Sequence, residues 1–252
     1  MKKPLLILLF SVIAFTLKAQ NWGGGIDQQD FNWGFSFQYV ASEYKIIRSP
    51  NWREAFRNTD PTEGPVGAQI ITDPLKSIVS PLSAGFGIGF VVNYKLTPNV
   101  DLRSTPTLIF NDRIVNYTFE ETGINPDFSE KEQRVQATMV DFPIGIKLKS
   151  ERRKDFRAYL LLGAKYSMDL ASGKKAKDET FVLKQKYLKN IKNFASYEAA
   201  IGFDLYFEYF KMSPELKVSH SFGNVIKREN HPYDTPIDKA ILRSFTFSLF
   251  FE

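Results

Sequence analysis

The sequence predicts an all-β fold, an eight-stranded antiparallel up-and-down transmembrane β-barrel of the outer-membrane type. Three observations lead to it. Apolar and polar residues alternate with a period of two through long segments, which is typical of strands. Aromatic residues are abundant, with 23 Phe and 11 Tyr among 252 residues, and they gather on the apolar phase. Long and short connections alternate along the chain, as in barrels with short periplasmic turns and long extracellular loops.

Eight segments carry the alternation. In the sixth, Ile201 and Phe203 share a phase opposite to Glu198 and Asp204. In the second, the glycines of GFGIGF repeat every two residues, so they lie on one strand face and thin the barrel wall. A nucleotide-binding loop would need a strand–turn–helix context, which is absent. In chain order, with examples of the apolar phase, the segments are 33–47 (Trp33, Phe35, Phe37), 84–96 (Phe86, Ile88, Phe90), 99–120 (Val100, Leu102, Leu108), 134–150 (Val140, Phe142, Ile144), 156–170 (Phe156, Leu160, Leu162), 196–209 (Ile201, Phe203, Leu205), 212–222 (Met212, Leu216, Val218) and 242–252 (Phe245, Phe247, Leu249).

The connections predict how the barrel, residues 33–252, is oriented. The links near residues 48–83, 121–133, 171–195 and 223–241 are long, and those between them are short. Alternate links of an up-and-down barrel fall at the same end, so all four long links lie together. We expect them to be extracellular loops, with short turns on the periplasmic side.

The N-terminus predicts export from the cytoplasm. Lys2 and Lys3 precede a short apolar run, which is typical of a secretory signal peptide over residues 1–20. A periplasmic leader over residues 21–32 would follow. Loss of the signal peptide also removes Lys18, so that the formal charge falls from +5 to +2. The remaining charge gives no reason to expect a nucleic-acid partner.

The expected lipid environment predicts which of the two faces of each strand points outward. In lipid, strands can span only as a closed sheet, because every backbone polar group must be bonded internally. Lipid also favours an apolar outer face. Eight strands leave an interior that side chains just fill, and charges buried there need partners. The expected inward ionic network, which leaves no open pore, is Arg103, Asp141, Lys147, Arg157, Lys165, Glu198, Asp204, Glu208, Glu215 and Lys217.

Periodicity alone leaves the inverse arrangement open, that of a lipocalin-like barrel with its apolar phase around a hydrophobic ligand. The loop asymmetry and the aromatic content favour lipid. The inward carboxylates have no recognisable Ser or His nucleophile beside them and are balanced by Lys and Arg, as in structural networks. The sequence has no Cys and two His, which argues against a metal site. We therefore predict a protein that is not an enzyme and has no cofactor.

One long loop is rich in lysine. Such a loop could bind lipopolysaccharide phosphates or an acidic protein, and a simply solvated loop accounts for it equally well. The candidate contacts are Lys174, Lys175, Lys177, Lys184, Lys186, Lys189 and Lys192.

Several stretches resemble a known family. VDFPIGIKLKS followed by FRAYLLLGAKYSMDL resembles a hairpin of small outer-membrane barrels of Bacteroidota. GFDLYFEYFKMSPELKVSHSFGNVI and FSLFFE are similar to the PorT (SprT) family, most densely over residues 134–252. This resemblance implies a non-enzymatic outer-membrane component of the type IX secretion system, a protein transport machine that also serves gliding motility in some species. Its partners would be translocon proteins. The alternative is a stand-alone OmpX-like envelope or adhesion barrel.

Overall fold

The computed structural model describes residues 29–61, 65–67, 69–122, 129–170 and 182–252. The predicted signal peptide, most of the predicted leader, and Lys174, Lys175 and Lys177 lie outside these residues. Within the described part of the chain, no helix has the length and apolar character needed to cross a membrane.

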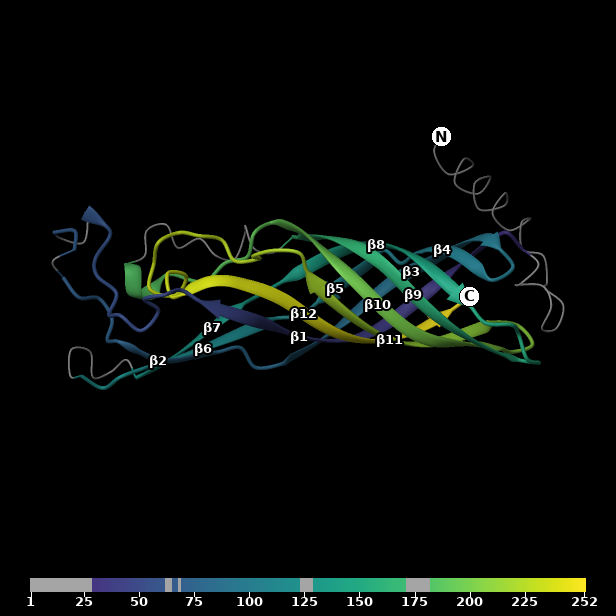
Figure 1. Cartoon of the computed structure of the whole chain (residues 1–252), viewed down its shortest axis with the longest axis horizontal. Helices are drawn as coiled ribbons and strands as arrows, with labels where there is room; N and C mark the ends of the chain where they lie inside the picture. Colours follow the sequence, from purple (N-terminus) through teal and green to yellow (C-terminus); the bar gives the residue numbers. More distant parts are fainter. Residues whose placement is uncertain (1–28, 62–64, 68, 123–128, 171–181) are drawn as a thin grey trace, which may run out of the picture.

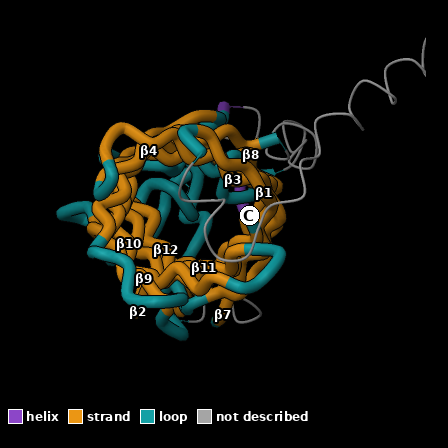
Figure 2. Tube along the Cα trace, turned by 90° about the vertical axis from the view of Figure 1, so that its right-hand side faces the viewer, coloured by secondary structure: helices purple, strands orange, loops and turns teal. Residues whose placement is uncertain are grey.

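The main sheet closes into a ring of eight antiparallel strands, which confirms the predicted fold class (Figures 1 and 2). β1 closes the ring because it pairs with β12 on one side, with Phe35 opposite Phe251, and with β3 on the other, with Phe35 opposite Phe90. The ring consists of β1 (Phe31–Arg48), β3 (Ser83–Thr97), β4 (Val100–Ser104) continued by β5 (Thr107–Phe110), β8 (Thr138–Lys149), β9 (Phe156–Asp169), β10 (Asn193–Tyr206), β11 (Lys211–Ser221) and β12 (Ile237–Phe251).

The third strand of the ring is interrupted, whereas the sequence predicted one strand over residues 99–120. Pro106 has no N–H to donate to the sheet, and its carbonyl accepts a hydrogen bond from the Phe90 N–H at 3.0 Å. Asn111 ends β5, because its Nδ2 donates to the Val40 and Ser83 carbonyls, each at 3.1 Å. The chain then leaves the barrel wall as β6 (Arg113–Phe119).

A second sheet of three strands extends the barrel at the end opposite the C-terminus (Figure 1). It pairs β2 (Leu75–Val79), β6 and β7 (Glu130–Val135) in the order β2-β6-β7. These strands lead into or continue β3, β5 and β8, so the small sheet prolongs one side of the barrel. The sequence analysis placed β2 and most of β7 in loops. The link over residues 48–83 is rich in Pro, Asn and charged residues, and EKEQRV is almost wholly polar.

This end of the molecule has its own hydrophobic core. Two connecting segments, residues 182–192 and 223–237, pack against the small sheet. The Tyr117 hydroxyl donates to the Tyr233 carbonyl at 2.6 Å, and the two rings meet edge to face with centroids 5.3 Å apart. We call β2, β6, β7 and these two segments the loop-end module. Buried residues of its core include Leu75, Ile78, Val115, Tyr117, Phe119, Val135, Leu188, Val225, Ile226 and Tyr233.

The apolar phase of the barrel faces outward, as predicted. Trp33 and Phe90 are 65% and 66% exposed, whereas Glu198 and Asp204 are 4% and 1% exposed. A soluble protein rarely presents an apolar surface this extensive to water. Hydrocarbon is therefore the surrounding that fits the outer wall, and the lipocalin-like arrangement is excluded.

Candidate functional site

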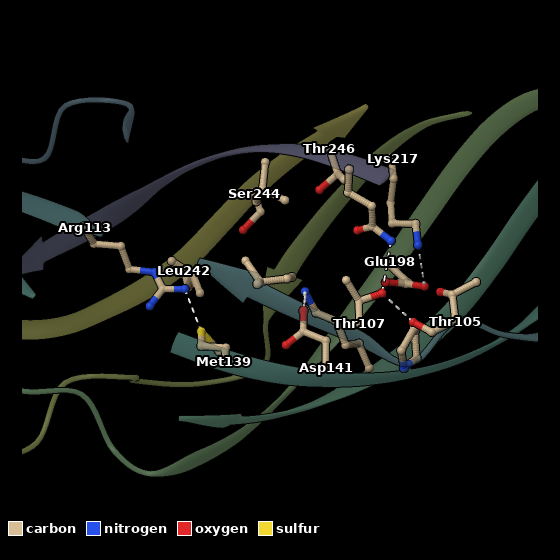
Figure 3. Close-up of a pocket in the computed structure, with 15 residues that line it drawn as sticks. Thr105, Thr107, Arg113, Met139, Asp141, Glu198, Lys217, Leu242, Ser244 and Thr246 are labelled. Carbon is tan, nitrogen blue, oxygen red and sulfur yellow. Dashed lines mark hydrogen bonds and ion pairs between the residues drawn. The ribbon is translucent and has the colours of Figure 1, made fainter. Parts of the chain in front are cut away.

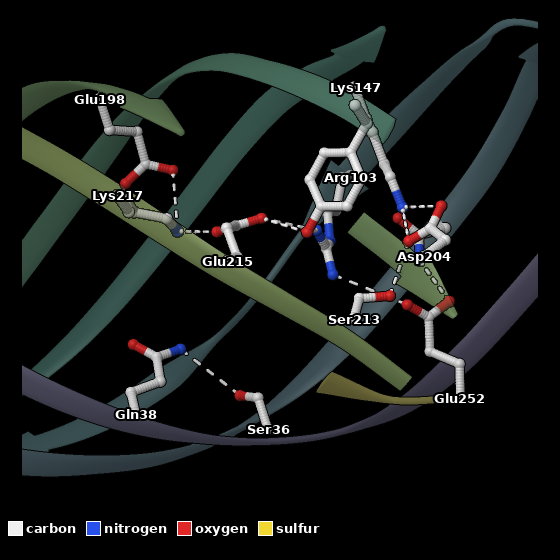
Figure 4. Close-up of polar contacts among 12 residues, drawn as sticks. Ser36, Gln38, Arg103, Lys147, Glu198, Asp204, Ser213, Glu215, Lys217 and Glu252 are labelled. Atoms are coloured by element: carbon white, nitrogen blue, oxygen red, sulfur yellow. Dashed lines mark hydrogen bonds and ion pairs between the residues drawn. The ribbon is translucent and has the colours of Figure 1, made fainter. Parts of the chain in front are cut away.

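The candidate functional site is the polar interior of the barrel. Alternate side chains of each strand point inward, so charged residues from distant parts of the sequence meet there (Figure 4). The residues that close the interior, which we call the lumen plug, are Arg103 of β4, Lys147 of β8, Tyr159 of β9, Asp204 of β10, Lys211 and Glu215 of β11, and Glu252, which follows β12.

Arg103 lies at the centre of the plug and is 1% exposed. Its Nη1 donates to Glu215 Oε2 at 2.8 Å and to the Tyr159 hydroxyl at 3.3 Å. Its Nη2 lies 3.6 Å from Glu252 Oε1. The guanidinium carbon lies 3.9 Å from the centroid of the Phe250 ring, a cation–π contact. One side chain thus links groups from three other strands or strand ends across the barrel.

A second ion pair lies beside Arg103. Lys147 Nζ donates to both carboxylate oxygens of Asp204 at 2.8 Å, and the Ser213 hydroxyl donates to Oδ1 at 2.6 Å. The ammonium also lies 3.9 Å from the centroid of the Tyr159 ring. Because both ions are almost completely buried, their multiple hydrogen bonds compensate the cost of removing them from water.

Glu252 joins the two parts of the plug. Its Oε2 accepts from Lys211 Nζ at 2.7 Å and from Asn93 Nδ2 at 2.6 Å, while Oε1 faces Arg103. The sequence analysis missed Lys211, Tyr159 and Glu252 as network members. The period of two carries a signal for each. Lys211 is in phase with Glu215, Tyr159 with Arg157, and Glu252 with the inward residues of β12.

Further ion pairs line the interior toward the loop-end module. Lys217 Nζ lies 3.4 Å from Glu198 Oε1 and 3.5 Å from Glu215 Oε1. Lys165 Nζ lies 2.8 Å from Asp141 Oδ2. Figure 3 shows Glu198, Lys217 and Asp141 gathered on one side of a small cavity, with Arg113 at its far side.

Two small cavities flank the plug. The one toward the loop-end module has a volume of about 20 Å³ and is lined by Asp141, Glu198 and Lys217 among others. The other, lined by Asn93, Lys211 and other polar residues, has a volume of about 10 Å³. A cavity needs roughly 10–15 Å³ to hold one water molecule. Each of these two cavities therefore has room for about one water molecule beside the plug.

The structure places the predicted network residues as follows. All of them except Glu208 face the interior, and Arg157 lies opposite Asp204 in the β9–β10 register. Glu208 differs because β10 ends at Tyr206, so Glu208 lies exposed in the turn over residues 207–210. There the Phe207 N–H donates to the Phe210 carbonyl at 2.9 Å, and the strand alternation no longer applies.

The lysine-rich loop is described only from residue 182 onward. Lys189 Nζ lies 2.9 Å from Glu229 Oε2 and so joins the two segments of the loop-end module. Lys184 and Lys186 are half-buried, and Lys192 is exposed. These lysines do not converge on one point. In the described part of the chain, no cluster of His, Asp and Glu side chains could hold a metal ion.

Solved structures show a likeness in fold. OprG of Pseudomonas aeruginosa is 13% identical with a TM-score of 0.39, over 86% of this chain and 94% of OprG. Ail of Yersinia pestis is 9% identical with a TM-score of 0.33, over 88% and 98%. Neisserial surface protein A (NspA) is 7% identical with a TM-score of 0.37, over 88% and 98%. No curated protein matches the sequence.

The sequence also matches a family model. The model is described as outer membrane protein beta-barrel domain, and it matches residues 19–227. This range is most of the chain and contains the greater part of the ring of strands. Because the family match agrees with the closed ring and its apolar outer wall, the chain belongs to the outer membrane protein β-barrel family and is a protein of the outer membrane.

Proposed function

We propose that this protein is a closed, non-enzymatic component of a protein secretion machine, the type IX secretion system, in a Bacteroidota-type bacterium. In this proposal it acts through contacts with other proteins and not as a pore. The lumen plug is the observation that supports a closed barrel. The resemblance of residues 134–252 to the PorT (SprT) family supports the assignment to this machine.

The plug argues against conduction on energetic grounds. A conducting path would require Arg103 to leave Glu215, and Lys147 to leave Asp204. Separation of a buried ion pair leaves uncompensated charge, at a cost of about 3–5 kcal/mol. Two such costs make an open barrel a rare state, so the interior serves to hold the wall rigid.

The loop-end module supports a role in protein contact. Its long connections pack around a core that includes Tyr117 and Tyr233, so the module presents a fixed surface. The outer face of β7 exposes Glu130, Glu132 and Arg134. A translocon protein with complementary charge is the kind of partner we expect there, and Lys192 is a further candidate contact for an acidic partner or for lipopolysaccharide.

Conductance measurements test the closed state. We expect the purified protein to give no conductance steps in a planar lipid bilayer in 1 M salt, under conditions in which a general porin does. Replacement of Arg103 and Lys147 by Ala shortens two side chains that cross the interior, and we expect brief openings from this variant. Stable conductance from the wild type would refute the closed state.

Co-purification tests the partnership. We expect the native protein, extracted from its own membrane in mild detergent, to elute with a large translocon complex. A variant with Glu130 and Glu132 replaced by Lys should fold normally and lose this association, whereas Lys154→Gln at the opposite end should keep it. Elution as a lone barrel would reject the secretion role while leaving the closed barrel intact.

A stand-alone envelope or adhesion barrel is the second candidate function. The position of the folded module beyond the lipid-facing wall favours it, because such a module is available to surfaces outside the cell. This function predicts a lone barrel on co-purification, together with reduced adherence of cells that lack the protein.

A further inference from the structure

A row of polar side chains crosses the outer wall near the loop-end module. The strand register places Tyr197 opposite His220, His220 opposite Arg243, and Arg243 opposite Glu43. All four belong to the outward phase of their strands. The rings of Tyr197 and His220 stack, with an interplanar angle of 8°. Aromatic residues with a polar group are typical of the membrane–water interface, so this row marks the edge of the hydrocarbon.

The next outward row toward the lipid is apolar. It consists of Ala199, Val218, Phe245 and Ala41, each paired with the next across neighbouring strands. The change from apolar to polar therefore takes one step along each of four strands. Phe222, which follows His220 by two residues and is 65% exposed, extends the apolar surface slightly beyond the row on one strand. Arg243 therefore lies close to the level of the lipid headgroups.

Cations gather just beyond the polar row on β1 and β12. The register pairs Glu43 with Arg243, Lys45 with Ile241, and Ile47 with Lys239. Lys45 is thus a diagonal neighbour of both Arg243 and Lys239, at Cα distances of about 7–8 Å. Both lysines are exposed. Among the residues that the structure describes, neither lysine forms an ion pair.

The Arg243 side chain is partly exposed and pairs with one carboxylate. Its Nη2 lies 2.9 Å from Glu43 Oε1. Its Nε is buried and has no hydrogen-bond partner in the described part of the chain. Three cations thus face one carboxylate, which leaves an excess of positive charge. Arg48 and Arg53, whose guanidinium carbons lie 4.6 and 5.0 Å from the centroid of the Trp52 ring, add more at the end of β1.

The cluster on β1 and β12 has no counterpart on β8 and β9. At the same end of β8 and β9, the outward residues are uncharged, namely Thr138, Val140, Tyr166 and Met168. A generic attraction to anionic lipid would not require such a localised cluster. The arrangement is that of a site.

An apolar hollow lies directly beneath the cations. It has a volume of about 550 Å³ and extends over the outer wall from β9 to β1. Small residues, Ala41 and Ala199, contribute to it, and larger ones such as Tyr39, Leu216 and Phe247 border it. Ala41 and Phe245 line the hollow and lie one outward step from Glu43 and Arg243, so the end of the hollow is next to the cationic cluster.

We propose that Lys45, Lys239 and Arg243 bind the phosphate groups of a lipid of the lipid A class in the outer leaflet, with an acyl chain in the hollow below. A guanidinium and two ammonium groups offer charge-assisted hydrogen bonds to phosphate oxygens. The hollow selects a lipid over free phosphate because it contributes apolar contact that a free anion cannot use. This site is independent of any role in secretion.

Native mass spectrometry of the full-length protein in mixed micelles tests the site. The probe is bisphosphorylated lipid A at increasing mole fraction. We expect Lys45→Gln, Lys239→Gln and Arg243→Gln together to weaken retention by about 100-fold, because each cation near a membrane surface contributes about five-fold. A control with Lys76, Lys154 and Arg134 replaced by Gln removes the same charge from exposed positions elsewhere and should retain lipid A as the wild type does.

Three comparisons sharpen the test. Glu43→Gln should strengthen retention by a few-fold, because it frees Arg243 from its carboxylate. Ala199→Phe, which fills the hollow, should weaken retention of lipid A with no change in cation number. Inorganic phosphate at 10 mM should not displace the lipid. Equal retention by the triple variant and its control, or full displacement by inorganic phosphate, would overturn the proposal, provided that heat-modified gel mobility shows each variant to be folded.

Discussion

The ends of the barrel strands reach into the core of the loop-end module, yet the two interiors have opposite character. Along β12, the inward residues Ser248, Thr246 and Ser244 give way to Leu242 and Ala240 beyond the membrane edge. The outward residues change in the opposite sense. Phe247 and Phe245 on the lipid side are followed by Arg243 and, farther along, Lys239. The polarity of the two faces therefore inverts within one strand.

The inversion follows from the solvent outside. Where lipid surrounds the barrel, the outer face is apolar and the polar groups turn inward. Where water surrounds the module, the ordinary arrangement of an apolar interior applies. The backbone alternation continues through both regions unchanged. Alternation therefore defines two faces, and the surroundings decide which of them carries the charges.

The largest effect should come from breaking one ion pair of the lumen plug. Lys147→Met leaves the Asp204 carboxylate buried with Ser213 as its remaining side-chain donor, which should cost about 3–5 kcal/mol of unfolding free energy. The double variant Lys147→Met, Asp204→Leu removes both charges and should recover most of that loss. Urea unfolding in lipid vesicles, followed by the folded fraction on gels, measures both. Additive losses in the double variant would show that the two residues are not coupled.

A comparable change in the module should leave the barrel folded. Leu188 is 3% exposed in the module core, and Leu188→Ala should destabilise that core by about 2–5 kcal/mol. We expect faster proteolysis of residues 223–237 with no change in the heat-modified gel mobility of the barrel. The solvent-exposed Tyr187→Ala provides the neighbouring control. Loss of the barrel band on gels in Leu188→Ala alone would mean that the module and the barrel unfold as one unit.

The sequence was sufficient for the barrel because its period of two is regular over long strands. Phe203, Glu198 and their neighbours lie on the expected faces for this reason. The same rule failed for Glu208, where a turn at Phe207 interrupts the strand. It also failed at Pro106, which splits a strand that the alternation treats as continuous.

The loop-end module could not be predicted in the same way. Its short strands carry mixed patterns. Its inward face is apolar, whereas the inward face of the barrel is polar, so the rule that works for the barrel fails in the module. Tyr117 and Tyr233 are 116 residues apart, and no local pattern reports that they meet. The partners within the plug are also non-local, because only the barrel closure decides that Arg103 reaches Glu215 and Glu252.

The position of the membrane edge can be tested by two variants that place the same charge at different depths on β12. Phe247→Arg places a cation on the lipid-facing wall and should cost about 2–4 kcal/mol if the residue lies near the midplane. Ile241→Arg places the same cation on the same strand beyond the polar row, where the cost should be about 0–1 kcal/mol. Folded yield in lipid vesicles measures the difference. Equal losses of folding free energy at the two positions would contradict the membrane edge that the polar row with Arg243 defines.

The smallest effect should be a dependence on pH in the module. Glu229 accepts from Lys227 Nζ at 2.6 Å and lies 2.9 Å from Lys189 Nζ. Partial burial raises the pKa of Glu229, but the hydrogen bonds from the two lysines outweigh it and lower this pKa below its usual value. A carboxyl group whose pKa is lowered on folding stabilises the protein above its unfolded pKa, and this contribution is lost as the pH falls through the folded pKa.

Glu229 and Lys189 are half-buried and Lys227 is exposed, so water still screens these ion pairs and their contribution should be under about 1 kcal/mol. We expect the hydrogen-exchange protection of residues 223–237, corrected for intrinsic rates, to fall as the pH drops below about 4.3, the unperturbed pKa of glutamate. Protection of the barrel strands should fall less over the same range, because Glu229 and its two lysine partners lie in connecting segments outside the ring of strands. Glu229→Gln should remove the pH dependence in the module at the cost of slightly lower protection at neutral pH. A pH dependence that persists in Glu229→Gln would assign the effect to another group, and the contact between the two segments would then owe its stability to the apolar core alone.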